Sequence, residues 1–206
     1  MGLFGKETDE KRVKRLAAHA GGIIEMLKDA FRTEKGTDLF PVLVFSASLA
    51  GMACHEAVKA SKGTFAVAED KQGRKYWFGD DLNRYLLENR TSVAGFCTAV
   101  VPLNPEEIPA MAAAFVSSIG TGEMTVCGFQ AEELWQRVHE CWEGIYDNMT
   151  ARFCRSPEDW PVLYGIVLQN ILLQAIQAGA PREEACRTAL VSAIAVSKMD
   201  RDSFLQ

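Results

Sequence analysis

The sequence lacks the short motifs that identify most nucleotide-binding proteins and hydrolases. It has no Walker loop, no G-x-G-x-x-G after an expected strand and no G-x-S-x-G elbow. With three histidines in the chain, a Ser-His-Asp or Cys-His arrangement would have to use His19, His55 or His139. The sequence pairs none of them with a nucleophile. Catalysis therefore has no positive support, and whether the chain is an enzyme stays open.

The six cysteines lack the spacing of metal or redox sites. No two of them are closer than 13 positions, which excludes a C-x-x-C pair, a zinc ribbon and a dithiol motif. Most have apolar neighbours, among which a thiol behaves as a small hydrophobic side chain. The first residues run directly into charged ones without the apolar core of a signal peptide. We therefore expect a cytoplasmic protein with reduced thiols.

Positive charge is also scarce, since the net charge is −5 at pH 7. The densest basic stretch, residues 11–15, follows three acidic residues, as is typical of a solvated helix face. Binding to nucleic acid needs clustered Lys and Arg that displace counterions. We therefore expect no nucleic-acid partner.

Two triplets combine possible metal ligands, Cys54-His55-Glu56 and His139-Glu140-Cys141. Adjacent residues on a helix point about 100° apart, so neither triplet can chelate a metal by itself. Helices that bind metals usually space their ligands by three or four residues, as in H-E-x-x-H or E-x-x-H, and neither of these two patterns occurs. We predict neither a metal nor a cofactor.

Two long segments carry no charge, Leu39–Cys54 and Trp160–Pro181, and each contains an aromatic residue followed by Pro-Val-Leu. A helix without charge must be buried on most of its faces. The second segment is long enough to span a bilayer, but it contains four Gln and Asn residues and lacks basic, aromatic-belted ends. The first is too short. We therefore expect two buried core helices that pack together, and no membrane partner.

The repeated Pro-Val-Leu suggests a weak internal duplication of residues 8–62 and 131–180. Pro41 and Pro161 are 120 positions apart, and the same offset aligns His19 with His139. Outside these positions the match without gaps is poor. Convergence on one helix-start pattern explains the similarity about as well as duplication does.

Hydrophobic periodicity with start and stop signals predicts helices over residues 8–35, 38–62, 80–88, 104–119, 131–153, 160–180 and 181–198. Alternating residues on either side of Gly73 predict a β-hairpin over 64–78. A lone hairpin is marginal, and 92–101 or 125–129 could supply a third strand. The sequence thus predicts a mainly α, multi-helix bundle around two uncharged core helices with one flanking β-hairpin. We expect a single compact domain over residues 1–206.

The densest group of polar and aromatic residues lies where the hairpin meets the next helix. A strand ends there, Gly79 allows a turn, and carboxylates meet a helix N-terminus, as in many small-ligand sites. A structural interpretation is also available, in which Asp80 or Asp81 caps the helix, Arg84 pairs with one of them and Trp77 covers the core. The candidate binding residues are Tyr76, Trp77, Asp80, Asp81, Asn83 and Arg84.

A second candidate is His139, because Trp135 and Trp142 lie four and three residues away on the same helical face. A histidine in such an aromatic groove could bind a ligand or act as a base. The alternative is a core histidine whose ring is satisfied by a backbone carbonyl.

These observations favour a non-enzymatic protein that recognises a small molecule or a partner protein through the hairpin–helix junction. The alternative is an enzyme acting on a small polar metabolite, with Asp80 or Asp81 as acid/base and Arg84 as anion clamp. A helical effector or immunity-type protein is a third possibility. Because many apolar residues remain once one core is filled, we also expect a homo-oligomer, in the simplest case a homodimer.

Overall fold

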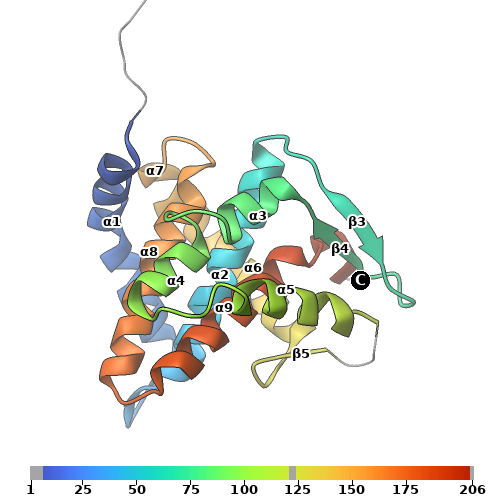
Figure 1. The fold of residues 1–206 in the computed structure, drawn as a ribbon. Helices are drawn as coiled ribbons and strands as arrows, with labels where there is room; N and C mark the ends of the chain where they lie inside the picture. The colour runs from blue at the N-terminus through green and yellow to red at the C-terminus, as the bar shows by residue number, and fades with distance from the viewer. Residues whose placement is uncertain (1–6, 121–123, 205–206) are drawn as a thin grey trace, which may run out of the picture.

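The fold is built around three helices, two of which are the uncharged segments. The computed structural model describes residues 7–120 and 124–204. Helix α2 (Leu39–Ala60) lies against both α8 (Asp159–Gln177) and α9 (Arg182–Lys198), as Figure 1 shows. The two predictions that the chain is a mainly α bundle and that its uncharged helices pack together are confirmed.

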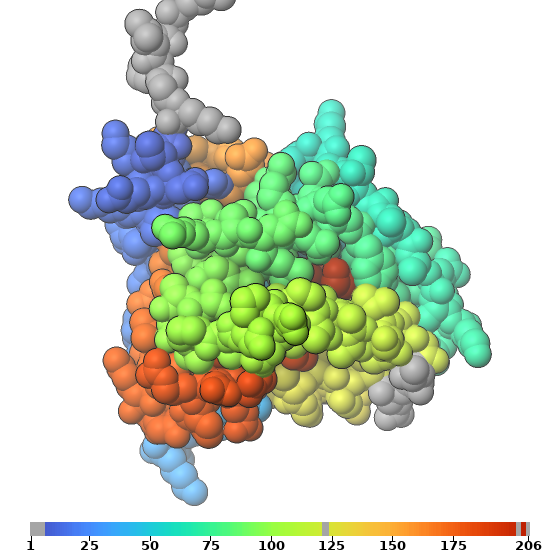
Figure 2. Space-filling model, viewed as in Figure 1, coloured from blue at the N-terminus to red at the C-terminus, as the bar shows by residue number. Residues whose placement is uncertain are grey.

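Shorter elements surround these three helices. The space-filling view shows α1 at one flank of the molecule and the hairpin of β3 and β4 at the other (Figure 2). The elements other than α2, α8 and α9 are α1 (Asp9–Ala30), β1 (Arg32–Thr33), β2 (Gly36–Thr37), β3 (Ala66–Glu69), β4 (Lys75–Phe78), α3 (Asp80–Leu86), α4 (Val93–Val100), α5 (Glu107–Ser118), β5 (Thr125–Val126), β6 (Phe129–Gln130), α6 (Ala131–Ile145), the π-helical turn η1 (Tyr146–Thr150), α7 (Ala151–Phe153) and α10 (Arg201–Phe204).

Helix α1 begins as predicted but ends earlier. The side chain of Thr8 accepts a hydrogen bond from the Lys11 N–H and caps the first turn. The predicted end at residue 35 is wrong, because the helix stops at Ala30 and the chain forms the short β1–β2 ribbon. Gly36 has φ +112°, a conformation that suits glycine and turns the chain toward α2.

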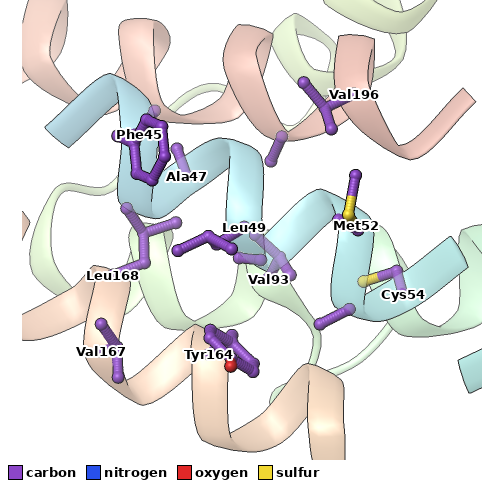
Figure 3. Close-up of a cluster of buried hydrophobic side chains, with 14 of the residues drawn as sticks. Phe45, Ala47, Leu49, Met52, Cys54, Val93, Tyr164, Val167, Leu168 and Val196 are labelled. Atoms are coloured by element: carbon purple, nitrogen blue, oxygen red, sulfur yellow. The ribbon is translucent and has the colours of Figure 1, made fainter. Parts of the chain in front are cut away.

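Helix α2 begins where Asp38 accepts a hydrogen bond from the Phe40 N–H at 3.1 Å. Its small residues allow α9 to approach closely. A Cβ atom at Gly51 would collide with the backbone carbonyl of Ala193. Larger apolar side chains of α2 and α8 fill the core on the other side (Figure 3).

Helix α9 is the third core helix, although its charged first turn gives no indication of this in the sequence. Its first turn carries Arg182, Glu183 and Glu184, but from Ala185 onward it is rich in buried alanine and serine. Small side chains suit a helix that lies backbone to backbone against α2. The core is thus a three-helix arrangement rather than a pair.

One helix of the described residues, α2, is long and apolar enough to cross a membrane, and 78% of its most apolar window is buried inside the protein. The expectation that the first uncharged segment is too short is wrong, because the helix continues for two turns past Cys54 and reaches 22 residues. Burial of this kind is what a core helix requires.

The predicted hairpin is confirmed as β3 and β4, which pair antiparallel with Gly73 at φ +81° in the turn. Both proposed sources of a third strand are wrong. Residues 93–100 form α4, which starts because the Ser92 hydroxyl accepts from the Gly95 N–H at 3.0 Å. Residues 125–130 form the β5–β6 ribbon, whose strands pair only with each other among the described residues. Instead, the segment after α9 supports β4 through a bridge between Tyr76 and Met199.

The predicted helix over 131–153 is interrupted. A π-helical turn separates α6 from the short α7. At this turn the Thr150 hydroxyl lies 2.8 Å from the buried Tyr164 hydroxyl of α8. The terminal methyl of Met149 lies 2.7 Å from where a Cβ at Gly22 of α1 would be, so this segment packs closely on α1.

Candidate functional site

At the hairpin–helix junction, the chain turns at Gly79 rather than at a capping carboxylate. Gly79 has φ +153° and occupies the N-cap of α3 without a side-chain cap. Of the structural interpretation, the prediction that Asp80 or Asp81 caps the helix is therefore wrong, whereas the prediction that Arg84 pairs with one of them is confirmed by its 3.8 Å ion pair with Asp81. Asp80 is exposed, whereas Asp81 accepts hydrogen bonds from the N–H of Thr64 at 3.1 Å and from its hydroxyl at 3.4 Å. Asp81 thus ties the start of the hairpin to α3.

Tyr76 is a fully buried member of the core. Its hydroxyl donates to the carboxylate of Asp70 at 3.2 Å, and the same carboxylate binds Arg74 at 2.7 Å. Burial raises the pKa of Tyr76 to about 12. Its ring packs edge-on against Phe115 and Phe204. Tyr76 therefore links the hairpin to α5 and to the C-terminal segment.

Trp77 is half-buried in an aromatic cluster with Phe65 and His55, whose ring centroids lie 4.2 and 5.1 Å away. Burial lowers the pKa of His55 to about 4, so its ring is neutral at pH 7. Nδ1 of His55 lies 3.0 Å from the Ser197 carbonyl and carries the proton. Within the described part of the chain, His55 Nε2 and Trp77 Nε1 are buried without a hydrogen-bond partner.

Lys198 lies in the same region and was not singled out from the sequence. It is buried at the end of α9, with Nζ 5.0 Å from the ring centroid of Phe78. Burial lowers its pKa to about 8. Its signal in the sequence is one charge that ends an otherwise uncharged run in α9.

Arg84 opens onto a polar cleft of about 330 Å³, hereafter the Arg84 cleft. Its side chain is 55% exposed and its nearest carboxylate, that of Asp81, is 3.8 Å away. The guanidinium lies over the ring of Tyr85, 5.0 Å from the centroid, and donates to the Tyr85 hydroxyl at 3.4 Å. The described residues that line this cleft are Asp9, Arg12, Arg84, Tyr85, Asn89, Thr91, Glu158 and Val162.

The opposite wall is held by ion pairs between α1 and the start of α8. Arg12 binds the buried carboxylate of Asp159 at 2.8 Å and donates to the carbonyl of Glu158. Arg15 binds the same carboxylate at 3.0 Å. Burial alone would raise the pKa of Asp159, but the Arg155 N–H and the two guanidinium groups hold it below its ordinary value. This wall is thus rigid and partly neutralised.

Tyr85 lies beside Arg84 in the lining of the cleft. Desolvation raises the pKa of its half-buried hydroxyl, and the carboxylate of Glu158 acts in the same direction, whereas Arg84 opposes it. The hydroxyl therefore stays protonated at pH 7, and its pKa depends on the charges of both Glu158 and Arg84.

Asn89 organises the loop between α3 and α4, from which Asn89 and Thr91 line the cleft. The Asn89 side chain donates to the Arg84 carbonyl at 2.8 Å and accepts from the N–H and the hydroxyl of Thr91 at 2.9 Å each. The Asn89 carbonyl occupies the space that a Cβ at Gly95 would need. A larger groove of about 820 Å³ lies along the other side of this loop. Asn89-Arg90-Thr91 is therefore a structured turn.

The second candidate group lies along α6. His139 is buried, its ring stacks on Trp135 with centroids 5.1 Å apart, and its Nε2 lies 3.2 Å from the Glu143 carboxylate. Trp142 instead packs against Trp160 and other rings of a separate cluster with Tyr146 and Tyr164. The structure thus brings His139 and Trp135 together inside the core.

The structure therefore distributes the sequence candidates over three places. Tyr76 and Trp77 belong to packed aromatic clusters, and Asp81 holds the hairpin. Asn83 is half-buried in α3, where its backbone carbonyl accepts from Leu87. Of the candidates at the junction, Arg84 lines the cleft. Its partners there come from α1, α8 and the following loop, and sequence reasoning missed them.

No group of three or more His, Cys, Asp or Glu side chains in the described residues could hold a metal ion. The six cysteines are free thiols. Burial raises the pKa of Cys141 and Cys186 to about 11, so these thiols stay protonated at pH 7.

The Arg84 cleft is thus a cavity where an exposed guanidinium meets further hydrogen-bonding groups. Asp80 and Asp81 are not among the described residues that line it. No protein-family model, curated protein or solved structure matches this chain, so the functional assignment rests on the geometry itself.

Proposed function

We propose that this protein is a non-enzymatic binding protein that holds a small polar molecule, bearing a carboxylate or similar anionic group, in the Arg84 cleft. The observation that carries the proposal is the state of Arg84. Its guanidinium is 55% exposed, faces a cavity and has no carboxylate closer than 3.8 Å among the described residues. A guanidinium presents a planar fork of donors that matches a carboxylate.

The other lining groups suit a polar ligand that carries an anionic group and a hydrogen-bond donor. The Tyr85 hydroxyl and the Arg84 guanidinium lie on one side, while the carboxylates of Asp9 and Glu158 also line the cleft. A ligand that carries both an anion and a hydrogen-bond donor, such as a small zwitterion, would complement both. The cleft volume of about 330 Å³ suits a small metabolite, since ligand pockets span about 300–1,000 Å³.

Native mass spectrometry followed by denaturation tests first for a retained molecule. A panel of small carboxylates, amines and zwitterions is then screened by ligand-detected NMR against the wild type, Arg84→Ala and Arg137→Ala. Compounds with a carboxylate are expected to bind the wild type and to lose about tenfold or more in affinity with Arg84→Ala.

Arg137→Ala is the matched control. Arg137 is an exposed arginine of α6 that pairs with Glu133 at 2.8 Å and does not line the cleft. It should keep wild-type affinity, and both variants should melt within a few degrees of the wild type because the substituted side chains are exposed. Binding that is unaffected by Arg84→Ala, or no binding by any compound, would contradict the proposal.

The rival hypothesis, an enzyme with Asp80 or Asp81 as acid/base, makes a separable prediction. Asp81→Asn would remove turnover but keep ligand binding, whereas a binding protein shows no conversion of any bound compound. Monitoring the NMR samples over time for new signals therefore distinguishes the two functions.

A further inference from the structure

A second cavity, of about 310 Å³, opens at the end of the bundle where α2 begins and α8 is followed by α9. Figure 1 shows the start of α2 and the turn between α8 and α9 near the same end of the molecule. None of its lining residues belongs to the Arg84 cleft. They are Thr37, Asp38, Leu39, Phe40, Leu43, Ala175, Ala178, Ala180, Pro181, Glu184, Ala185 and Thr188.

The walls of this cavity are mostly apolar. Leu39, Phe40 and Leu43 come from the first turns of α2, and Phe40 keeps 50% of its surface exposed. The rest of the lining includes alanines of α8, of the turn that follows it and of α9, whose short side chains leave the space unfilled. An apolar molecule that enters would remove both its own surface and that of Phe40 from water, which favours binding.

The charged groups in the lining have one sign. They are the carboxylates of Asp38 and Glu184, and no lysine or arginine is among the described residues of this cavity. Asp38 uses Oδ1 to accept from the Phe40 N–H, and so offsets the positive end of the α2 dipole. Glu184 has no ion pair or hydrogen bond with a side chain of the described residues.

The helix dipoles also contribute to the negative potential in this cavity. Helix α8 ends at this cavity, so the negative end of its dipole lies near Ala175 and Ala178. The N-terminus of α9 would favour an anion, but Glu183 and Glu184 in its first turn counter it. The balance of fixed charges therefore favours a cation.

We propose that this cavity binds a small molecule with an apolar body and one cationic group, such as an aromatic or alkyl ammonium ion. The apolar body lies against Phe40 and Leu43, and the ammonium group binds the Glu184 carboxylate. This site is independent of the Arg84 cleft and of the function proposed for it.

Calorimetric titration with 2-phenylethylammonium, 2-phenylethanol and phenylacetate tests the proposal, at pH 7 and 0.15 M salt. These probes share one apolar body and differ in charge. The ammonium ion is expected to bind best and the carboxylate worst. Glu184→Gln should weaken the ammonium ion about three- to fivefold, as for a solvent-accessible ion pair, and leave the alcohol unchanged.

Three variants make the result specific. Glu183→Gln is the matched control, since Glu183 is the neighbouring carboxylate but pairs with Arg187 and does not line the cavity. Ala178→Phe places a ring at an exposed lining position and should abolish binding of all three probes. Arg84→Ala should change nothing here, even if it removes binding at the other site.

Two results would overturn the proposal. Equal affinities for the three probes would mean that the carboxylates do not select a cation. Absence of binding at millimolar concentration in the wild type, or binding that survives in a folded Ala178→Phe protein, would mean that the cavity is not a site for such ions.

Discussion

Lys198 places a charged group in the core at the end of α9, where 4% of its surface is exposed. No ion pair with a described residue compensates it, and its Nζ lies 5.0 Å from the ring centroid of Phe78. Desolvation lowers the pKa of this lysine from its ordinary value of 10.5 to about 8. The native state therefore releases the proton more readily than the unfolded chain does, and a charged Lys198 costs stability at neutral pH.

Lys198→Met should raise the free energy of unfolding by about 1–2 kcal/mol at pH 7. The variant recovers the desolvation cost of the charged amine but loses the contact of the cation with Phe78, and this figure is the difference between the two free energies. Since the folded pKa lies below the unfolded one, wild-type stability rises between pH 8 and 10.5, and the advantage of the variant shrinks over this window. Urea unfolding at pH 7 and pH 10 measures both effects.

The control for this experiment is Lys71→Met in the exposed hairpin turn. It should leave the free energy of unfolding nearly unchanged at both pH values, because a solvated lysine has no desolvation cost to recover. A Lys198→Met protein that is less stable than the wild type at pH 7 would show that the charge makes a compensating contact.

At the scale of elements, the approach of α2 to α9 depends on the absence of a side chain at Gly51. Gly51→Ala should destabilise the protein by about 1–3 kcal/mol, because the new methyl group collides with the carbonyl of Ala193 and the helices must separate. Thermal unfolding followed by circular dichroism measures the loss.

Gly144→Ala is the matched control, since Gly144 is also helical but has nothing within 4 Å of a Cβ. It should be neutral or stabilise the protein by up to about 1 kcal/mol, because alanine loses less backbone entropy in a helix. If the two variants change stability equally, helix propensity rather than packing sets the effect at Gly51.

Elements of the fold that have a local signal in the sequence can be predicted, and contacts between distant segments cannot. Lack of charge and helical periodicity identify buried helices such as α2, and Gly73 marks the hairpin turn. Residues 93–100 were ambiguous because a short apolar run has no periodicity that distinguishes strand from helix. The cap formed by Ser92 stabilises a helix in this segment. Tertiary partners, such as Met199 beside Tyr76, leave no local signal.

The candidate site is likewise predictable only where its residues are close together in the sequence. Arg84 stands out in the sequence because it follows a turn, two carboxylates and aromatic residues. Arg12 and Glu158, which complete the cleft, are more than 70 positions away from Arg84. The charges around Arg12 suggest an ordinary solvated helix face, and Glu158 precedes the uncharged segment of α8 without a signal of its own. Asn89 is recognisable only as part of a polar loop, and its role depends on the contact with Gly95.

At the scale of the whole molecule, the structure uses most of its apolar residues in its own core. The large apolar side chains that stay exposed in the described residues are scattered over five elements, namely Met26, Phe40, Val67, Val116 and Leu173. Self-association, which was expected from an excess of apolar residues, therefore stays a prediction. Sedimentation velocity over a range of concentrations tests it, and a monomer throughout would contradict it.

The packing also connects the two halves of the chain. Helix α1 packs on α8 and α6 packs on α2, so the first helix of each half covers the uncharged helix of the other. In the same way, α4 packs on α8 and α9 packs on α2. An internal duplication would predict this reciprocal pattern. We expect the two halves to unfold as one cooperative unit, because each covers the uncharged helix of the other.

This interlocking predicts the behaviour of separate halves. A fragment of residues 1–120 would expose the faces of α2 that α8 and α9 cover, and a fragment of residues 124–206 would expose the matching faces of α8 and α9. Each alone should lack a cooperative thermal transition, because its uncharged helix has lost its partners. Mixed after co-refolding, the fragments should regain the helical circular dichroism and a single transition. A fragment that unfolds cooperatively by itself would contradict the prediction of one domain, since its core would then not depend on helices from the other half.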